Sequence, residues 1–255
     1  ALQYFDCLRQ GARNTAFAGF PARAEQLLKL NLVRAEERLA ERMAQYRPLH
    51  LVALGEVYTG RDSFGLALRY YQDAQPGMTT PEARLELATA RARCHIALMQ
   101  YRQAKMVLDE APADALEQRH PLVAARYYEQ YGALQAAQGL DSLAAGSFRK
   151  CLALRKSGKA PPNEHAAALY YLGAQLHKGG KVDSAMLFYQ QALAQVEGRT
   201  LTPGAEQVRL LYALGRGWLD KDEPNEALNR LNQAAAICRD VKHNRYVPQE
   251  AIYFY

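Results

Sequence analysis

Histidine and cysteine are the residue types in this chain best suited to catalysis or metal binding, but their spacing favours neither role. Cys94 and His95 are adjacent, so on a helix they point about 100° apart and cannot both ligate one metal ion. His165 and His177 are twelve residues apart, which does not place them on one helical face. The four cysteines lie far from one another, as reduced packing thiols of a cytoplasmic protein do. A periplasmic sensor segment would show the same cysteine pattern.

Known catalytic motifs are also missing from the sequence. It contains no G-x-S-x-G, no H-E-x-x-H and no C-x-x-C motif. Gly215, in the segment GRGWLD, lacks both the glycine spacing of a phosphate-binding loop and a preceding strand. Cys151 occupies a position typical of small packing residues, which favours a buried, unreactive thiol. The sequence therefore predicts a protein that is not an enzyme and that has no cofactor and no metal site.

The charge pattern narrows the class of partner. The 255 residues include 32 lysines and arginines and 26 acidic residues, a net charge of +6, but the two signs alternate along the chain. A continuous basic stripe interleaved with aromatics, which an RNA-binding solenoid would need, is not found, so no nucleic-acid partner is predicted. No apolar run approaches the roughly 18 residues that span a bilayer, so no membrane-spanning segment is predicted.

One pattern of large, small and turn residues recurs about every 40 residues. It is clearest around Gly173, where the members lie at offsets −4, −1, 0, +3, +7, +12, +16 and +19. The same offsets fit around Gly55, Gly132 and Gly215, and two degraded copies are centred on Ala12 and Ala92. In the first of these, Thr15 and Asn31 depart from the pattern.

The spacing within one copy predicts two antiparallel helices. Residues at −4, −1 and +3 share one face of a first helix, and those at +12, +16 and +19 share one face of a second. Position +7 is a turn residue, Gly or Asp in the better copies. Small residues at 0 and +12 would let the two backbones approach closely. The large residues at +16 would fill the space against the next helix pair: Tyr71, Phe148, Tyr189 and Leu231.

This pattern resembles the tetratricopeptide repeat (TPR) family. The resemblance implies an all-α fold, a right-handed superhelix of about six stacked antiparallel helix pairs, within one array over 1–255. The period exceeds the usual 34 residues of the family, as in longer-period arrays of bacterial regulatory proteins. Residues 22–46 read as one unusually long helix. The predicted repeats are 5–47 (degenerate), 48–84, 85–124, 125–165, 166–207 and 208–248, with 249–255 starting a further helix.

The resemblance also implies a concave groove lined by the first helix of each pair. Arginine and tyrosine dominate binding hot spots because they combine contact area with directional hydrogen bonds. Family members that bind chaperone tails hold a peptide carboxylate with lysines and asparagines, but the matching positions here are Glu129, Ala133, Tyr171 and Arg209, which disfavours that role. The groove residues predicted by carry-over are Arg93, Arg126, Tyr170, His177, Lys178, Arg209, Tyr212 and Arg216.

The sequence is consistent with two functions. The first is a non-enzymatic module that binds a protein or peptide in the groove, with an acidic or carboxylate-ended segment favoured by the excess of cations. The alternative is a sensory or regulatory segment of a longer bacterial signalling protein, such as a histidine kinase or a transcription regulator. The longer period and the chain ends, which lack a starting methionine and stop at AIYFY, favour this alternative.

Overall fold

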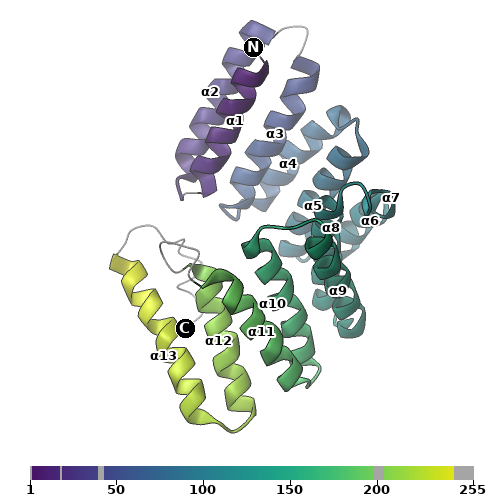
Figure 1. The fold of residues 1–255 in the computed structure, drawn as a ribbon. Helices are drawn as coiled ribbons and strands as arrows, with labels where there is room; N and C mark the ends of the chain where they lie inside the picture. Colours follow the sequence, from purple (N-terminus) through teal and green to yellow (C-terminus); the bar gives the residue numbers. More distant parts are fainter. Residues whose placement is uncertain (1, 18, 40–42, 198–203, 244–255) are drawn as a thin grey trace. The chain divides into compact units, whose positions relative to one another are not determined.

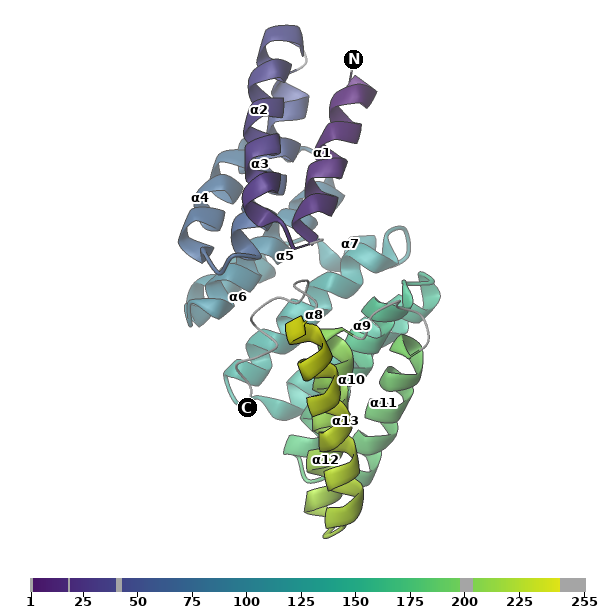
Figure 2. The same ribbon diagram turned by 90° about the vertical axis from the view of Figure 1, so that its left-hand side faces the viewer.

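A computed structural model describes residues 2–17, 19–39, 43–197 and 204–243 of the chain. All the regular elements in these ranges are helices, which confirms the predicted all-α class. The chain divides into two compact units, 1–116 and 117–255 (Figures 1 and 2). The continuous array predicted over 1–255 stays a prediction, because each unit is defined by its own internal packing.

The first unit contains three helix pairs followed by a short helix. Within each pair the two helices are joined by a tight turn and pack along each other. The pairs are α1 (Leu2–Phe17) with α2 (Pro21–Leu39), α3 (Met43–Thr59) with α4 (Phe64–Ala74), and α5 (Pro81–Ala97) with α6 (Tyr101–Asp109); the 3₁₀ helix η2 (Gln75–Gly77) follows α4, and α7 (Ala113–Leu116) ends the unit.

The second unit contains three further pairs. The second helix of each of the first two pairs packs against the first helix of the next pair, so the pairs are stacked in chain order. They are α8 (Pro121–Ala137) with α9 (Asp141–Ser157), α10 (Pro162–Lys178) with α11 (Val182–Val196), and α12 (Ala205–Asp220) with α13 (Pro224–His243).

The turn inside each pair has a residue in the left-handed region at the predicted +7 position. This conformation ends the first helix and reverses the chain, and it is most accessible to glycine, asparagine and aspartate. After Gly180, for example, the Lys181 N–H donates to the Leu176 carbonyl, closing the end of α10. The left-handed residues of these six turns are Gly19, Asp62, Met99, Gly139, Gly180 and Asp222.

Glycine at position 0 makes room for the large residue at +16 of the same pair. A Cβ added at Gly173 would lie 2.7 Å from the ring of Tyr189, and one at Gly132 would lie 2.8 Å from the ring of Phe148. The repeat pattern predicts that these rings fill the space against the next pair. That assignment is incomplete, because each ring first covers its own glycine, although Phe148 also stacks on Tyr171 of the next pair.

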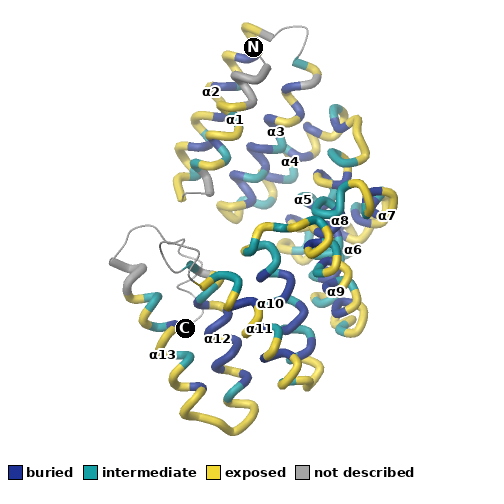
Figure 3. Tube along the Cα trace, viewed as in Figure 1, coloured by how far each residue is buried: buried dark blue, intermediate teal, exposed yellow. Residues whose placement is uncertain are grey.

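Buried and exposed residues alternate along the helices (Figure 3), and the small residues at +12 are buried in every pair. All six are alanines with side chains at most 1% exposed, so each position has room for a methyl group and little more. They are Ala24, Ala67, Ala104, Ala144, Ala185 and Ala227. The degenerate copy around Ala12 is therefore a helix pair packed like the others.

The single long helix predicted over 22–46 is wrong. The helix α2 extends only to Leu39, and α3 already begins at Met43. Packing overrides the local pattern here, because the Asn31 amide of α2 donates a hydrogen bond to the Tyr46 hydroxyl of α3 at 2.9 Å. Such a contact requires the chain to fold back on itself.

Helix starts differ from the predicted repeat boundaries by a few residues. The pairs that follow the first begin at 43, 81, 121, 162 and 205, before the predicted starts at 48, 85, 125, 166 and 208. The predicted starts were counted from the packing residues and so omit the first turn of each helix. That turn begins with proline in α5, α8 and α10. The predicted helix over 249–255 lies outside the described residues.

Candidate functional site

Seven of the eight predicted groove residues lie in the second unit, on the first helices of its three pairs. Arg126 is on α8; Tyr170, His177 and Lys178 are on α10; and Arg209, Tyr212 and Arg216 are on α12. Arg93 is an exposed residue of α5 in the first unit, and its membership of the same surface stays a prediction.

The helix α12 carries an exposed face that we call the α12 stripe, formed by Arg209, Tyr212 and Arg216. Spacings of three and four residues bring these side chains to one face of the helix, opposite the buried Leu211 and Leu214. Within the described part of the chain, neither arginine makes an ion pair. The guanidinium carbon of Arg209 lies 5.6 Å from the centre of the Tyr170 ring, a cation–π distance.

Aromatic rings of α10 continue this surface away from α12. Tyr170 contacts Tyr171 at a ring-centre distance of 5.6 Å and Tyr189 at 5.8 Å. Burial raises the pKa of Tyr170, and the positive charges of Arg209 and Arg216 act in the opposite direction. Both arginines are thus near enough to the phenol to affect it electrostatically. The arrangement offers two exposed cations on one helix face, one of them over a tyrosine ring that keeps its hydroxyl proton at neutral pH.

Three other predicted groove residues already bind neighbouring helices. The Arg126 guanidinium on α8 donates to the Glu164 carboxylate of α10 at 3.2 Å. Lys178 donates to Asp141 at 2.8 Å, and the ring of His177 bonds to Asp220. These three side chains therefore connect successive elements of the stack.

The Lys178 contact belongs to a series. Lys221, just after α12, donates to Asp183 in the first turn of α11 at 2.7 Å, as Lys178 at the end of α10 does to Asp141 in the first turn of α9. Each lysine thus joins one pair to the second helix of the pair before it. Their repeated geometry favours a structural role for Lys178 over ligand binding.

Arg155 is an interior charge that the sequence analysis missed. It is 3% exposed on α9, donates to the Glu129 carboxylate of α8, and donates to the Glu164 backbone carbonyl of α10. A signal for it exists in the sequence: Arg155 follows Ala144, Phe148 and Cys151 on the same helical face. A charge on an apolar face indicates a buried partner.

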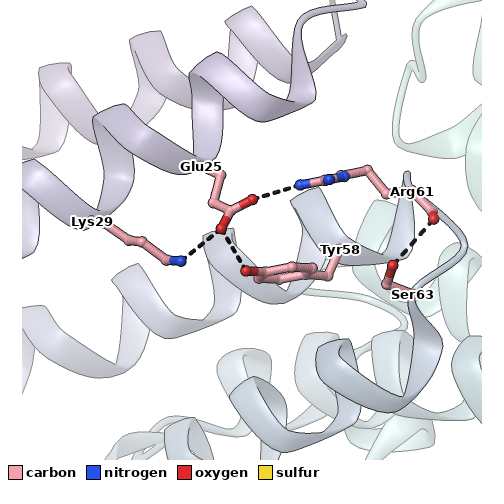
Figure 4. A network of polar contacts seen from close by, with 5 residues as sticks. All are labelled: Glu25, Lys29, Tyr58, Arg61 and Ser63. Carbon is pink, nitrogen blue, oxygen red and sulfur yellow. Dashed lines mark hydrogen bonds and ion pairs between the residues drawn. The ribbon is translucent and has the colours of Figure 1, made fainter.

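In the first unit, a polar network centred on Glu25 joins α2 to α3 and to the turn after α3 (Figure 4). Its carboxylate accepts hydrogen bonds from Lys29 at 2.6 Å and from the Tyr58 hydroxyl at 2.7 Å, and it also binds Arg61. The hydrogen bonds from Lys29 and Tyr58 hold the pKa of Glu25 below its ordinary value. The network joins the first helix pair to the second.

The described cysteines and metal-ligating side chains are not arranged for thiol catalysis or metal binding. Burial raises the pKa of the Cys151 thiol to about 12 and raises that of Cys94, which makes both poor nucleophiles at neutral pH. No cluster of three or more metal-ligating side chains occurs among the described residues. Over the same residues, no helix is both long and apolar enough to cross a bilayer.

Solved structures with a similar arrangement of helices include a STAND signal-transduction ATPase with a tetratricopeptide repeat sensor from Pyrococcus horikoshii. The identity is 15% and the TM-score 0.72, over 94% of this chain and 36% of that one. The fold is TPR-like. This chain thus spans about a third of the length of the ATPase.

Two further TPR-like neighbours are structures with a bound factor or peptide. The Rap protein complexed with competence and sporulation factor matches at 13% identity and a TM-score of 0.65, over 93% of this chain and 78% of that one. NprR in complex with its cognate peptide NprX matches at 13% identity and a TM-score of 0.62, over 93% of this chain and 68% of that one. Identities this low show the fold alone. No protein-family model and no curated protein matches the chain.

Proposed function

We propose that this chain is a non-enzymatic module that binds a protein or peptide segment at the α12 stripe and the adjoining rings of α10. The observation that carries the proposal is the state of Arg209 and Arg216. Both are exposed, Arg209 lies over the Tyr170 ring, and neither arginine makes an ion pair within the described part of the chain. Exposed arginines next to tyrosines are the residue types that bind protein partners most strongly.

An acidic or carboxylate-ended segment fits this surface best. Arginine binds carboxylates with two parallel hydrogen bonds, and within the described residues neither arginine of the α12 stripe is already paired with a carboxylate. Arg126 contributes less, because Glu164 already neutralises it. The neighbours Rap and NprR, with their bound factor and peptide, support a ligand of the peptide class for a TPR-like chain.

The second candidate is a sensory or regulatory segment of a longer signalling protein. The similarity to the STAND ATPase, of which this chain spans about a third, favours it. In this case the same surface would bind the signal, and an attached domain would respond. The sequence of the complete gene product decides between a separate module and a sensor segment.

Affinity capture with the whole chain tests the proposed surface. Arg209→Glu combined with Arg216→Glu reverses both charges, and we expect captured partners to lose roughly tenfold or more of their affinity. Raising the salt concentration should weaken the wild-type complex in the same direction. Arg149→Glu, at an exposed position of α9, is the matched control and should retain the partners.

Mass spectrometry of the captured proteins gives the readout. A set of partners that is the same for the wild type, the double variant and the control would contradict the proposal. A footprint confined to residues 181–195 of the second-helix face would do the same, because it would place binding on α11.

A further inference from the structure

The spacing of the two arginines on the α12 stripe restricts which acidic segment can bind both. Arg209 and Arg216 are seven residues apart, so with a rise of 1.5 Å per residue their Cα atoms are separated by about 10.5 Å along the helix axis. Seven residues are almost two full turns, which brings the side chains to within about 20° of one face. A single carboxylate is too small to bridge that distance, so full use of both arginines requires two acidic groups.

Backbone conformation determines which sequence spacing presents two acids at that separation. A polyproline II segment has three residues per turn and rises 3.1 Å per residue, so side chains at i and i+3 share a face and are about 9.3 Å apart. In a β-strand, residues i and i+2 share a face but are only about 6.7 Å apart. The polyproline II spacing differs from the helix spacing of the two arginines by about 1 Å, and the strand spacing differs from it by about 4 Å, so the polyproline II segment is the closer match.

The aromatic residues of the surface favour the same conformation. Tyr212 lies between the two arginines on α12, and the Tyr170 ring lies beneath the guanidinium of Arg209. Polyproline II segments bind to surfaces lined by aromatic rings, and they lose little conformational entropy on binding because the conformation is already populated. An α-helical partner would need acids at i and i+7 and would gain no comparable advantage from the rings.

Carboxylates at both ends of the α12 stripe limit how many acidic residues the ligand can carry. Glu206 lies one turn before Arg209, and Asp220 lies one turn after Arg216; both are exposed. Additional acids of a ligand next to these positions would meet like charge, which disfavours binding. The surface therefore selects a short acidic pair over a long acidic run.

We propose that the α12 stripe binds a polyproline II segment carrying two acidic side chains separated by two residues, with one acid on Arg209 and the other on Arg216. This inference rests on the proposed function and specifies its ligand.

Four synthetic peptides test the spacing against the whole chain by fluorescence anisotropy. All are proline-rich and labelled, with blocked ends so that no terminal carboxylate contributes. The first has glutamates at i and i+3, the second at i and i+2, the third has one glutamate, and the fourth has glutamine at both positions. We expect the first to bind about fivefold more tightly than the second or third, and the fourth to bind weakest.

Matched variants assign each acid to its arginine. Arg216→Gln or Arg209→Gln should reduce the affinity of the i, i+3 peptide to that of the single-glutamate peptide, whose own affinity should change less. Arg149→Gln on α9 should leave all four affinities unchanged. Circular dichroism of each variant verifies that the helices are intact, since all three positions are exposed.

The outcomes separate this inference from the proposed function. Equal binding of the i, i+2 and i, i+3 peptides, lost in the arginine variants, would overturn the spacing but retain an acid-binding surface. Tighter binding of a helical peptide with acids at i and i+7 would overturn the polyproline II conformation. If none of the acidic peptides binds better than the glutamine peptide, the spacing and the acidic preference are both wrong, and partner capture alone would still test the surface.

Discussion

The two units use the same helix pair but join successive pairs differently. In the first unit the joint between the first two pairs is polar: Asn31 bonds to Tyr46, His50 to the Leu28 carbonyl, and Glu25 to Tyr58. In the second unit the interior contacts of the joints are mainly aromatic and apolar, with Phe148 stacked on Tyr171 and Met186 packed against Gly217, and its lysine–aspartate pairs lie at the exposed helix ends. A repeat can thus keep its internal packing while its joints change chemistry.

Arg155 is a buried charge within these apolar joints of the second unit, and removing it should have the largest effect. Arg155→Ala leaves Glu129, whose side chain is 19% exposed, without its buried partner. Because unpairing a buried ion pair costs about 3 to 5 kcal/mol, and Glu129 retains some solvent, we expect a loss of about 3 kcal/mol in the free energy of unfolding. Urea denaturation measures it.

A comparison with the first unit sharpens this prediction. Arg13 and Glu56 also pair, with nitrogen–oxygen distances of 2.6 and 2.8 Å, but their side chains are 29% and 32% exposed. Burial raises the pKa of Glu56, so this pair is only partly screened, but its side chains keep more contact with solvent than Arg155 does. Arg13→Ala should therefore cost less than Arg155→Ala, about 1 to 2 kcal/mol. Equal losses in the two variants would show that burial does not distinguish the two ion pairs.

The polar joint of the first unit should respond to acid through His50. Its ring is fully buried and bonds to the Leu28 carbonyl, and burial lowers its pKa to about 4, from an ordinary value of 6.5. The unfolded chain therefore binds a proton between pH 6.5 and 4 that the folded chain does not bind. Stability is complete above about pH 7 and falls as the pH decreases through this window, by about 2 kcal/mol at pH 5.

His50→Gln provides the test. Urea midpoints at pH 7.5 and pH 5 should differ more for the wild type than for the variant, by the equivalent of about 2 kcal/mol. Burial also lowers the pKa of His165, but the wild type and the His50→Gln variant both contain this residue, so its effect cancels in the difference between them. An identical pH dependence in the two chains would mean that His50 is protonated without unfolding.

The difference between packing within a helix pair and contacts between pairs explains how much of the structure the sequence predicts. Glycines, alanines and left-handed turn residues recur at fixed offsets because the geometry of a pair requires them, so the pairs and their turns were predictable. Asn31 departs from that pattern, and its hydrogen bond to Tyr46 depends on a second helix that no local rule identifies. For the candidate site, the helical positions were predictable. Whether a cation is already paired, as Lys178 is and as Arg216 is not among the described residues, depends on neighbours distant in sequence.

The smallest expected effect concerns the packing that both units share, and it uses two glycines of the second unit. Gly173→Ala would place a methyl group 2.7 Å from the Tyr189 ring, which is 2% exposed and has little room to move. Such overpacking costs about 1 to 3 kcal/mol. Replacing glycine by alanine inside a helix returns up to about 1 kcal/mol, so we expect a net loss of about 1 kcal/mol.

Gly146→Ala on α9 supplies the matched control, because a Cβ there meets nothing within 4 Å and the position is exposed. Only the helix propensity then acts, so this variant should gain about 0.5 to 1 kcal/mol. The two substitutions are chemically identical and should shift the urea midpoint in opposite directions. A gain in both would mean that the Tyr189 ring moves aside without cost, and close contact between the glycine and the ring would no longer account for glycine at the centre of the repeat.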